Sequence, residues 1–102
     1  MNYKNKNVTV FGLDRSGLAV TKLLDEMRAK VLVTDLKSEN ELQNQFDELN
    51  DRKIEFVLGG HDERCIEKAD LIVVSPGVPL NIPILQEARK RGILVLGELE
   101  VS

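Results

Sequence analysis

Five short apolar runs, separated by amphipathic segments, set the pattern of hydrophobic and polar positions along the chain. The runs cover residues 8–11, 30–35, 54–58, 69–75 and 93–96. They are brief, rich in β-branched residues and nearly continuous in apolar character, which is typical of strands covered on both faces by helices. The pattern therefore predicts five strands of a parallel sheet.

Segments in which apolar residues have helical spacing follow the first two runs. Apolar residues recur at i, i+3, i+4 and i+7 after residue 16, which predicts a helix that starts near Ser16. Its expected buried stripe consists of Val20, Leu23, Leu24 and Met27. Ser38 followed by Glu41 is a capping box and predicts the start of a second helix. The expected buried residues of this helix are Leu42, Phe46 and Leu49.

Two further helices complete the predicted elements. A short helix is expected over Glu63–Lys68. The last helix is predicted to start near Asn81, with Pro83 in its first turn, and to end at Gly92. Its expected buried residues are Ile84, Leu85 and Ala88.

The alternation of strands and helices predicts an α/β fold with one domain over residues 1–102. We expect a Rossmann-like, five-stranded parallel sheet in the order 3-2-1-4-5, with helices on both faces. Ligands of such sheets bind beyond the carboxyl ends of the strands, where the strand order reverses. Three loops reach that point here, at residues 12–17, 35–37 and 75–79.

The loop Gly12–Gly17 resembles the G-x-G-x-x-G turn of dinucleotide-binding domains, but Asp14 occupies the position of the middle glycine. The helix N-terminus that follows favours an anion, and Arg15 and Ser16 offer a cation and a hydroxyl. Asp14 places a negative charge where a phosphate would come. Two interpretations stay open: an anion-binding turn of altered chemistry, or a ligand-free turn capped by Asp14 or Ser16.

The other two loops have similar alternatives. Asp35 ends the second predicted strand, where a carboxylate can accept hydrogen bonds from a ribose or a base of a bound nucleotide. The alternative is that Asp35 binds no ligand and is a solvated residue before Ser38. The loop Ser75-Pro76-Gly77 is rigid and has exposed N–H groups, but a plain turn would look the same. Its place at the reversal of strand order favours the binding interpretation.

Composition narrows the classes of function. A net charge of -3, 4% aromatic residues and no basic run longer than 89–91 argue against nucleic acid as a partner. The single cysteine, Cys65, fits a reducing cytoplasm, and no stretch approaches membrane-spanning length. His61 is expected in a solvated loop. With no metal-ligand spacing and no catalytic set, the chain is predicted to be a binding domain without catalytic or metal-binding residues.

Five segments in order, "VTVFGLDRSGLAVTKLL", "VTD", "GGHDE", "ADLIVVSPGVPLNIPIL" and "GILVLGELE", resemble the N-terminal domain of the bacterial cytoplasmic Mur ligases. "SPG" and "GELE" are the most specific. The resemblance implies a domain that holds the UDP part of UDP-N-acetylmuramoyl-L-alanine and itself binds no cofactor. It also implies further domains that use ATP and Mg²⁺ to add D-glutamate in peptidoglycan precursor synthesis. The chain stops before any P-loop, so we expect it to be inactive as a ligase on its own.

The resemblance also implies roles by position. Arg15 and Ser16 match family residues that contact the diphosphate. Residues 35–37 match the segment around the uracil, and residues 75–77 match the loop that closes on the nucleotide sugar. The expected substrate-binding residues are therefore Asp14, Arg15, Ser16, Gly17, Asp35, Leu36, Lys37, Ser75, Pro76 and Gly77. The family often has glycine at position 14 and a small hydroxyl residue or another side chain at position 36. Two alternatives remain, an NAD(P)-binding domain and a ligand-free interaction domain.

Overall fold

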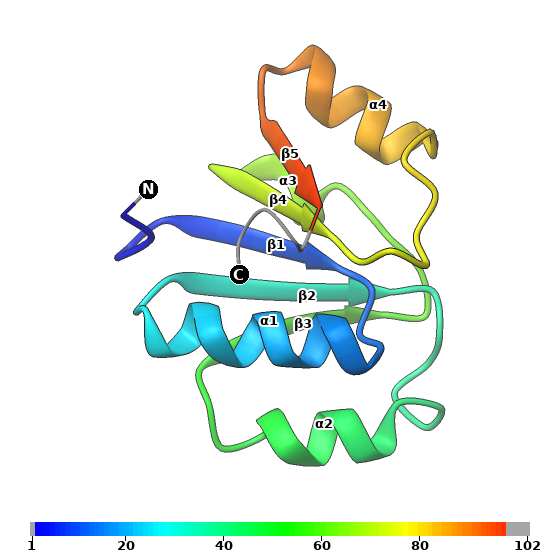
Figure 1. The fold of residues 1–102 in the computed structure, drawn as a ribbon. Helices are drawn as coiled ribbons and strands as arrows, with labels where there is room; N and C mark the ends of the chain where they lie inside the picture. The colour runs from blue at the N-terminus through cyan, green and yellow to red at the C-terminus, as the bar shows by residue number, and fades with distance from the viewer. Residues whose placement is uncertain (1, 98–102) are drawn as a thin grey trace.

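The structure, a computed structural model, describes residues 2–97 and contains a parallel sheet with helices on both faces (Figure 1). The strands are β1 (Asn7–Phe11), β2 (Lys30–Asp35), β3 (Ile54–Leu58), β4 (Leu71–Val74) and β5 (Leu94–Gly97). The helices are α1 (Arg15–Glu26), α2 (Gln43–Leu49), α3 (Arg64–Glu67) and α4 (Pro83–Lys90). The order is β3-β2-β1-β4-β5, and every pair is parallel, so the predicted topology is confirmed.

Two hydrophobic cores lie on opposite faces of this sheet because successive side chains of a strand point to opposite faces. One core joins α1 and α2 to the sheet through Val8, Val10, Val20, Leu24, Val31, Val33, Leu49, Leu71 and Val73. The other joins α3 and α4 to it through Phe11, Val57, Cys65, Ile66, Ile72, Val74, Leu85 and Ala88. Because helices cover both faces, all four residues of β4 are buried, which explains its unbroken apolar run.

The buried face of α1 differs from the predicted stripe. It consists of Gly17, Val20, Thr21 and Leu24, which is the expected spacing displaced by one turn toward the N-terminus. Met27 is the C-cap residue rather than a core residue, and 36% of its surface is exposed. Thr21 is buried in spite of its hydroxyl because Oγ1 donates to the carbonyl of Gly17 at 2.7 Å. A buried threonine of this kind gives no apolar signal in the sequence.

The second helix begins later than its capping box indicates. The backbone N–H of Ser38 donates to Glu41 Oε1 at 3.1 Å, and that of Glu41 donates to Ser38 Oγ at 3.4 Å. The reciprocal bonds are present, but they close a turn, and α2 starts only at Gln43. Leu42 and Leu49 are buried as expected, whereas Phe46 is half-buried against the ring of Phe56, at 5.0 Å between centroids.

The remaining boundaries shift by a few residues. The last helix starts at Pro83, in its first position, and Ile84 is half-buried rather than buried. Arg91 caps this helix, and Gly92 follows with φ +79°, a left-handed conformation that suits glycine. The fourth strand is shorter than its apolar run because residues 69–70 and 75 lie outside the ladder.

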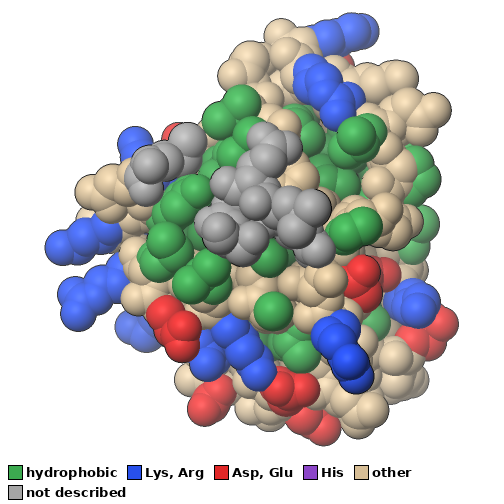
Figure 2. All heavy atoms as spheres, viewed as in Figure 1, with side chains coloured by type: hydrophobic (Ala, Val, Ile, Leu, Met, Phe, Trp, Pro, Cys, Tyr) green, Lys and Arg blue, Asp and Glu red, His purple; other side chains and the backbone are tan. Residues whose placement is uncertain are grey.

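The surface seen from the side of Figure 1 carries charges of both signs. Figure 2 shows lysine and arginine side chains interspersed with aspartate and glutamate along the lower part of this face, and hydrophobic side chains nearer its middle. Within residues 2–97, no helix is long and apolar enough to cross a membrane.

The reversal of strand order lies between β1 and β4. Their ladder ends at the pair Phe11 and Val74, and one backbone bond to each neighbouring strand continues past the end of β1. Ser75 N donates to Phe11 O at 3.0 Å, and Gly12 N donates to Thr34 O at 2.8 Å. The chain then enters α1 on one face after β1 and continues to α4 on the other face after β4. The loops therefore diverge and leave space at this edge of the sheet.

Candidate binding site at the carboxyl edge of the sheet

A cavity of about 680 Å³ lies at this edge, a size typical of small-molecule sites. Its walls come from three predicted loops, from the loop after β3 and from the start of α4. The lining residues are Gly12, Asp14, Asp35, Leu36, Lys37, His61, Gly77, Val78, Pro79, Ile82, Pro83 and Ile84. The wall formed by residues 78–84 is apolar, whereas the charged and titratable groups come from the loops after β1, β2 and β3.

Half of the predicted substrate-binding residues line this cavity: Asp14, Asp35, Leu36, Lys37 and Gly77. The other half, Arg15, Ser16, Gly17, Ser75 and Pro76, are adjacent in sequence but do not line it. Of these, Gly17 and Ser75 are buried and shape the loops. Arg15 is exposed at the first position of α1.

Asp14 is the N-cap of α1, which decides between the two capping candidates. Its Oδ1 accepts a hydrogen bond from Gly17 N at 2.7 Å. The same oxygen accepts a second bond from Ser75 Oγ, also at 2.7 Å. Ser75 is only 2% exposed, so its hydroxyl needs this partner. One carboxylate oxygen thus links the turn after β1 to the loop after β4.

Both glycines of the first turn are required by close approaches. Gly12 has φ +97°, and a Cβ there would lie 2.8 Å from Ser75 Cβ and 2.9 Å from Val78 Cγ2. A Cβ on Gly17 would lie 1.9 Å from the carbonyl oxygen of Gly12. The atoms nearest to such a Cβ all belong to the turn itself.

Several backbone donors on these loops have no acceptor within residues 2–97. The N–H groups of Gly17 and Leu18 are taken by Asp14, through Oδ1 and the carbonyl oxygen. Those of Arg15 and Ser16 donate to no protein group in the described part of the chain. The same holds for Leu36 N and Gly77 N. Free N–H groups at the start of a twelve-residue helix favour an anion.

Both oxygens of Asp35 are engaged within the protein. Oδ2 accepts from Leu13 N at 2.7 Å, and Oδ1 accepts from Lys37 N at 2.9 Å. Leu13 is fully buried, so Asp35 satisfies a donor that water does not reach. The carboxylate therefore holds the end of β2 against the turn after β1.

Replacing Asp35 tests this structural role. Asp35→Ala is expected to lower the free energy of unfolding by about 1–3 kcal/mol, because Leu13 N loses its partner. Asp35→Asn should lower the free energy of unfolding by less, since its amide oxygen can still accept a hydrogen bond. Urea denaturation measures both, with the exposed Asp51→Ala as a control that leaves stability nearly unchanged. A loss for Asp35→Ala no greater than that of the control would contradict the role.

The prediction that His61 is a solvated loop residue is wrong. It is half-buried and lines the cavity, with Nδ1 2.7 Å from Thr34 Oγ1 and its ring 4.8 Å from the ring of Phe11. Gly59 N donates to Lys37 O at 2.8 Å, and Gly60 N donates to Asp35 O at 3.1 Å, which brings this loop to the edge. The parallel sheet is the signal that could have found it, because the loop after β3 meets the same edge.

Burial lowers the pKa of His61, and the charge of Asp35 opposes that shift. An unfolded histidine titrates near pH 6.5, so below that pH the unfolded chain binds the proton more readily. The free energy of unfolding should therefore be highest above about pH 6.5 and should fall as the pH drops from there through the lower, folded-state pKa of His61. Urea midpoints at about pH 7.5 and 5.5 measure this slope, and His61→Gln should flatten it. Equal slopes for both proteins would contradict the prediction.

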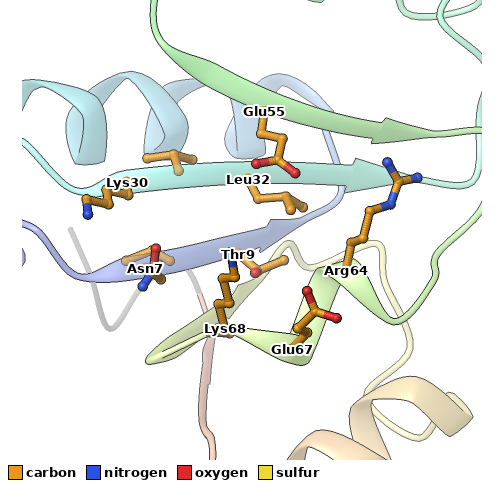
Figure 3. Close-up of a pocket in the computed structure, with 11 residues that line it drawn as sticks. Asn7, Thr9, Lys30, Leu32, Glu55, Arg64, Glu67 and Lys68 are labelled. Atoms are coloured by element: carbon orange, nitrogen blue, oxygen red, sulfur yellow. The ribbon is translucent and has the colours of Figure 1, made fainter.

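A second, smaller cavity of about 220 Å³ lies on the face covered by α3 (Figure 3). Its lining includes Asn7 and Lys30, which begin β1 and β2, and charged residues of both signs, Glu55, Arg64 and Glu67. The loops 12–17 and 75–79 contribute nothing to it. Within residues 2–97, no group of three or more His, Cys, Asp or Glu side chains is arranged to hold a metal ion. The larger cavity is the better candidate site.

Residues 6–97 match the family described as "Mur ligase MurD-like, N-terminal domain". The chain belongs to this family. UDP-N-acetylmuramoylalanine--D-glutamate ligases are among the curated relatives of this MurD-like domain. That of Koribacter versatilis is 45% identical over 102 residues, and that of Alkaliphilus oremlandii is 43% identical over 104. Both alignments cover 100% of this chain but only 22% and 23% of the relatives, so the chain spans less than a quarter of their length.

Solved structures agree on the fold. A pseudomurein peptide ligase type C from Methanothermus fervidus is similar to the MurD-like domain, with a TM-score of 0.74 and 27% identity. The match covers 95% of this chain and 20% of that ligase. Shikimate dehydrogenase from Aquifex aeolicus gives a TM-score of 0.67 at 20% identity, over 96% of this chain and 44% of that one. The second likeness shows the Rossmann-like fold alone.

Proposed function

We propose that this chain binds the UDP part of UDP-N-acetylmuramoyl-L-alanine, as the N-terminal domain of a ligase that adds D-glutamate to it in peptidoglycan precursor synthesis. The observation that carries the proposal is the cavity at the reversal of strand order. Its walls include the three loops that the family resemblance relates to the nucleotide sugar. Membership of the MurD-like family supports the substrate class.

The site offers matching chemistry for each part of the ligand. The free N–H groups of Arg15 and Ser16, at the start of α1, suit the diphosphate. Leu36 is 71% exposed at the cavity and offers an apolar surface to the uracil ring. Gly77 lines the cavity with an unpartnered N–H, which suits the sugar side of the ligand.

In this proposal the chain binds and orients the substrate, and the chemical step belongs to other domains. ATP and Mg²⁺ would supply the activation of the substrate carboxyl group, and D-glutamate would bind with them outside this chain. The sequence contains no G-x-x-x-x-G-K-[ST] motif, the loop that cradles ATP phosphates. We therefore propose that the chain has no ligase activity alone and contributes by holding one reactant in place.

Binding of NAD(P) is the alternative that the fold likeness to dehydrogenases and the position of Asp35 favour. A dinucleotide site needs a carboxylate oxygen for the ribose hydroxyls, but both oxygens of Asp35 already accept backbone hydrogen bonds. It also needs close approach of a pyrophosphate to the turn, where Asp14 now lies. Asp14 faces the pyrophosphate of NAD(P) and the diphosphate of UDP alike, so the engaged oxygens of Asp35 are the observation that favours the UDP ligand.

Isothermal titration calorimetry distinguishes these candidates. UDP-N-acetylmuramoyl-L-alanine is expected to release or absorb heat in a saturable isotherm, whereas NAD⁺ and NADP⁺ at the same concentrations should give only heats of dilution. Saturable binding of NAD⁺ or NADP⁺ with no response to the UDP ligand would make the dinucleotide function the better interpretation.

A further inference from the structure

The two oxygens of Asp14 differ in their surroundings. Oδ1 accepts both hydrogen bonds, from Gly17 N and Ser75 Oγ. Oδ2 accepts none within residues 2–97, and it lies 3.9 Å from where a Cβ on Gly77 would be. Asp14 is exposed and lines the cavity, so one carboxylate oxygen is available there, between the first turn and the loop after β4.

The charge of Asp14 is not neutralised by an ion pair. No lysine or arginine in the described part of the chain lies within 4.0 Å of its carboxylate oxygens. Asp35 and Lys37 also line the cavity, so with a neutral His61 the lining carries a formal charge of -1. A site with a net negative lining is unusual for a ligand that carries a diphosphate, and it points to a role in selection.

Asp14 also occupies the place that a phosphate takes in turns with a central glycine. Its Oδ1 binds Gly17 N, a donor at the start of the helix that would otherwise serve the ligand. A bound diphosphate is left with the N–H groups of Arg15 and Ser16 and lies close to the Asp14 carboxylate. The amount of negative charge on the nearest phosphate then decides how strongly the carboxylate opposes binding.

We propose that Asp14 makes this site select a nucleoside diphosphate whose terminal phosphate is esterified to a sugar over one with a free terminal phosphate. The inference rests on the proposed function and adds a residue that distinguishes nucleotide sugar from free UDP. A free terminal phosphate carries roughly one further negative charge near pH 8, which Oδ2 repels. The sugar ester removes that charge, and sugar hydroxyls donate hydrogen bonds that Oδ2 accepts.

The test compares dissociation constants for UDP and for UDP-N-acetylmuramoyl-L-alanine in the wild-type chain and in Asp14→Asn. Asparagine keeps an oxygen for Gly17 N and Ser75 Oγ but removes the charge. NMR titration of the labelled chain near pH 8 measures weak binding as well as tight binding. The substitution is expected to improve the affinity for UDP about three- to tenfold more than the affinity for the nucleotide sugar. An unchanged ratio of the two constants would overturn the inference.

Two further variants separate charge from loop position. Asp51→Asn removes the same charge at an exposed residue outside the cavity lining and should leave the ratio unchanged. Ser75→Ala removes the hydrogen bond between the loops but keeps the Asp14 carboxylate, so it should lower the affinity for both ligands by the same factor. A change of ratio in Ser75→Ala equal to that in Asp14→Asn would refute selection by charge.

Failure of the proposed function would look different. If neither ligand shifts the amides of residues 12–17, 35–37 or 75–79, the site does not bind uridine diphosphates and the inference fails with it. If both ligands shift those amides and the ratio is the same in Asp14→Asn, the proposed function stands and only the selection by Asp14 is wrong.

Discussion

Gly17→Ala should lower the free energy of unfolding by about 3 kcal/mol or more, a large part of the stability of a small domain. The added Cβ would lie 1.9 Å from the carbonyl oxygen of Gly12. That oxygen belongs to backbone, and the turn is fixed by Gly12 N donating to Thr34 O at 2.8 Å. The turn has to open or α1 has to move away, and either change also strains the bond between Gly17 N and Asp14.

A matched substitution controls for the general effect of adding a methyl group to a glycine. At Gly77 the nearest atom to a new Cβ is Asp14 Oδ2 at 3.9 Å, an ordinary contact. Gly77→Ala should therefore change stability by no more than about 0.5 kcal/mol. Urea denaturation of both variants measures the difference. Equal stabilities for Gly17→Ala and Gly77→Ala would refute the close approach at Gly17.

Gly77→Leu should reduce the affinity for UDP-N-acetylmuramoyl-L-alanine about tenfold or more while the chain stays folded. The space at Gly77 accepts a Cβ, and its φ lies outside the left-handed region, so the fold tolerates a side chain. Gly77 lines the cavity, however, and a leucine there would occupy volume that the ligand needs. In a full-length ligase, affinity for ATP should change much less than affinity for the nucleotide sugar.

Ala19→Leu is the control for this second substitution, because it adds a similar side chain at an exposed position of α1 outside the cavity lining. Calorimetric titration should give wild-type affinity for Ala19→Leu and the loss for Gly77→Leu. An unfolding midpoint near that of wild type establishes that Gly77→Leu is folded. Wild-type affinity in a folded Gly77→Leu would place the ligand elsewhere.

The strands were predictable because each is a short apolar run with a polar segment on either side. Residues 30–35 and 54–58 are apolar, β-branched runs between polar segments, and β2 and β3 have those same bounds. Helix boundaries were predicted less accurately because the same local hydrogen bonds can either start a helix or close a turn. The Ser38 and Glu41 box is formed, yet it closes a turn instead of starting α2.

The position of the cavity was predictable from topology, whereas only part of its lining was. The strand order places three loops at one edge, and the cavity is there. The presence of His61 depends on how Gly59 and Gly60 turn the chain, with φ +81° and +143°. The roles of Asp14 and Asp35 depend on which backbone N–H groups point at them, which residue types alone do not specify.

We propose that the cavity between the loops after β1, β2 and β4 holds a uridine diphosphate sugar. Chemical-shift mapping of the labelled chain with UDP-N-acetylmuramoyl-L-alanine tests it most directly. We expect the largest amide shifts at the unpartnered donors of Arg15, Ser16, Leu36 and Gly77, with His61 also affected. Shifts confined to residues outside these loops, for example around Arg64 and Glu67 at the smaller cavity, would show that the ligand does not bind in the larger cavity.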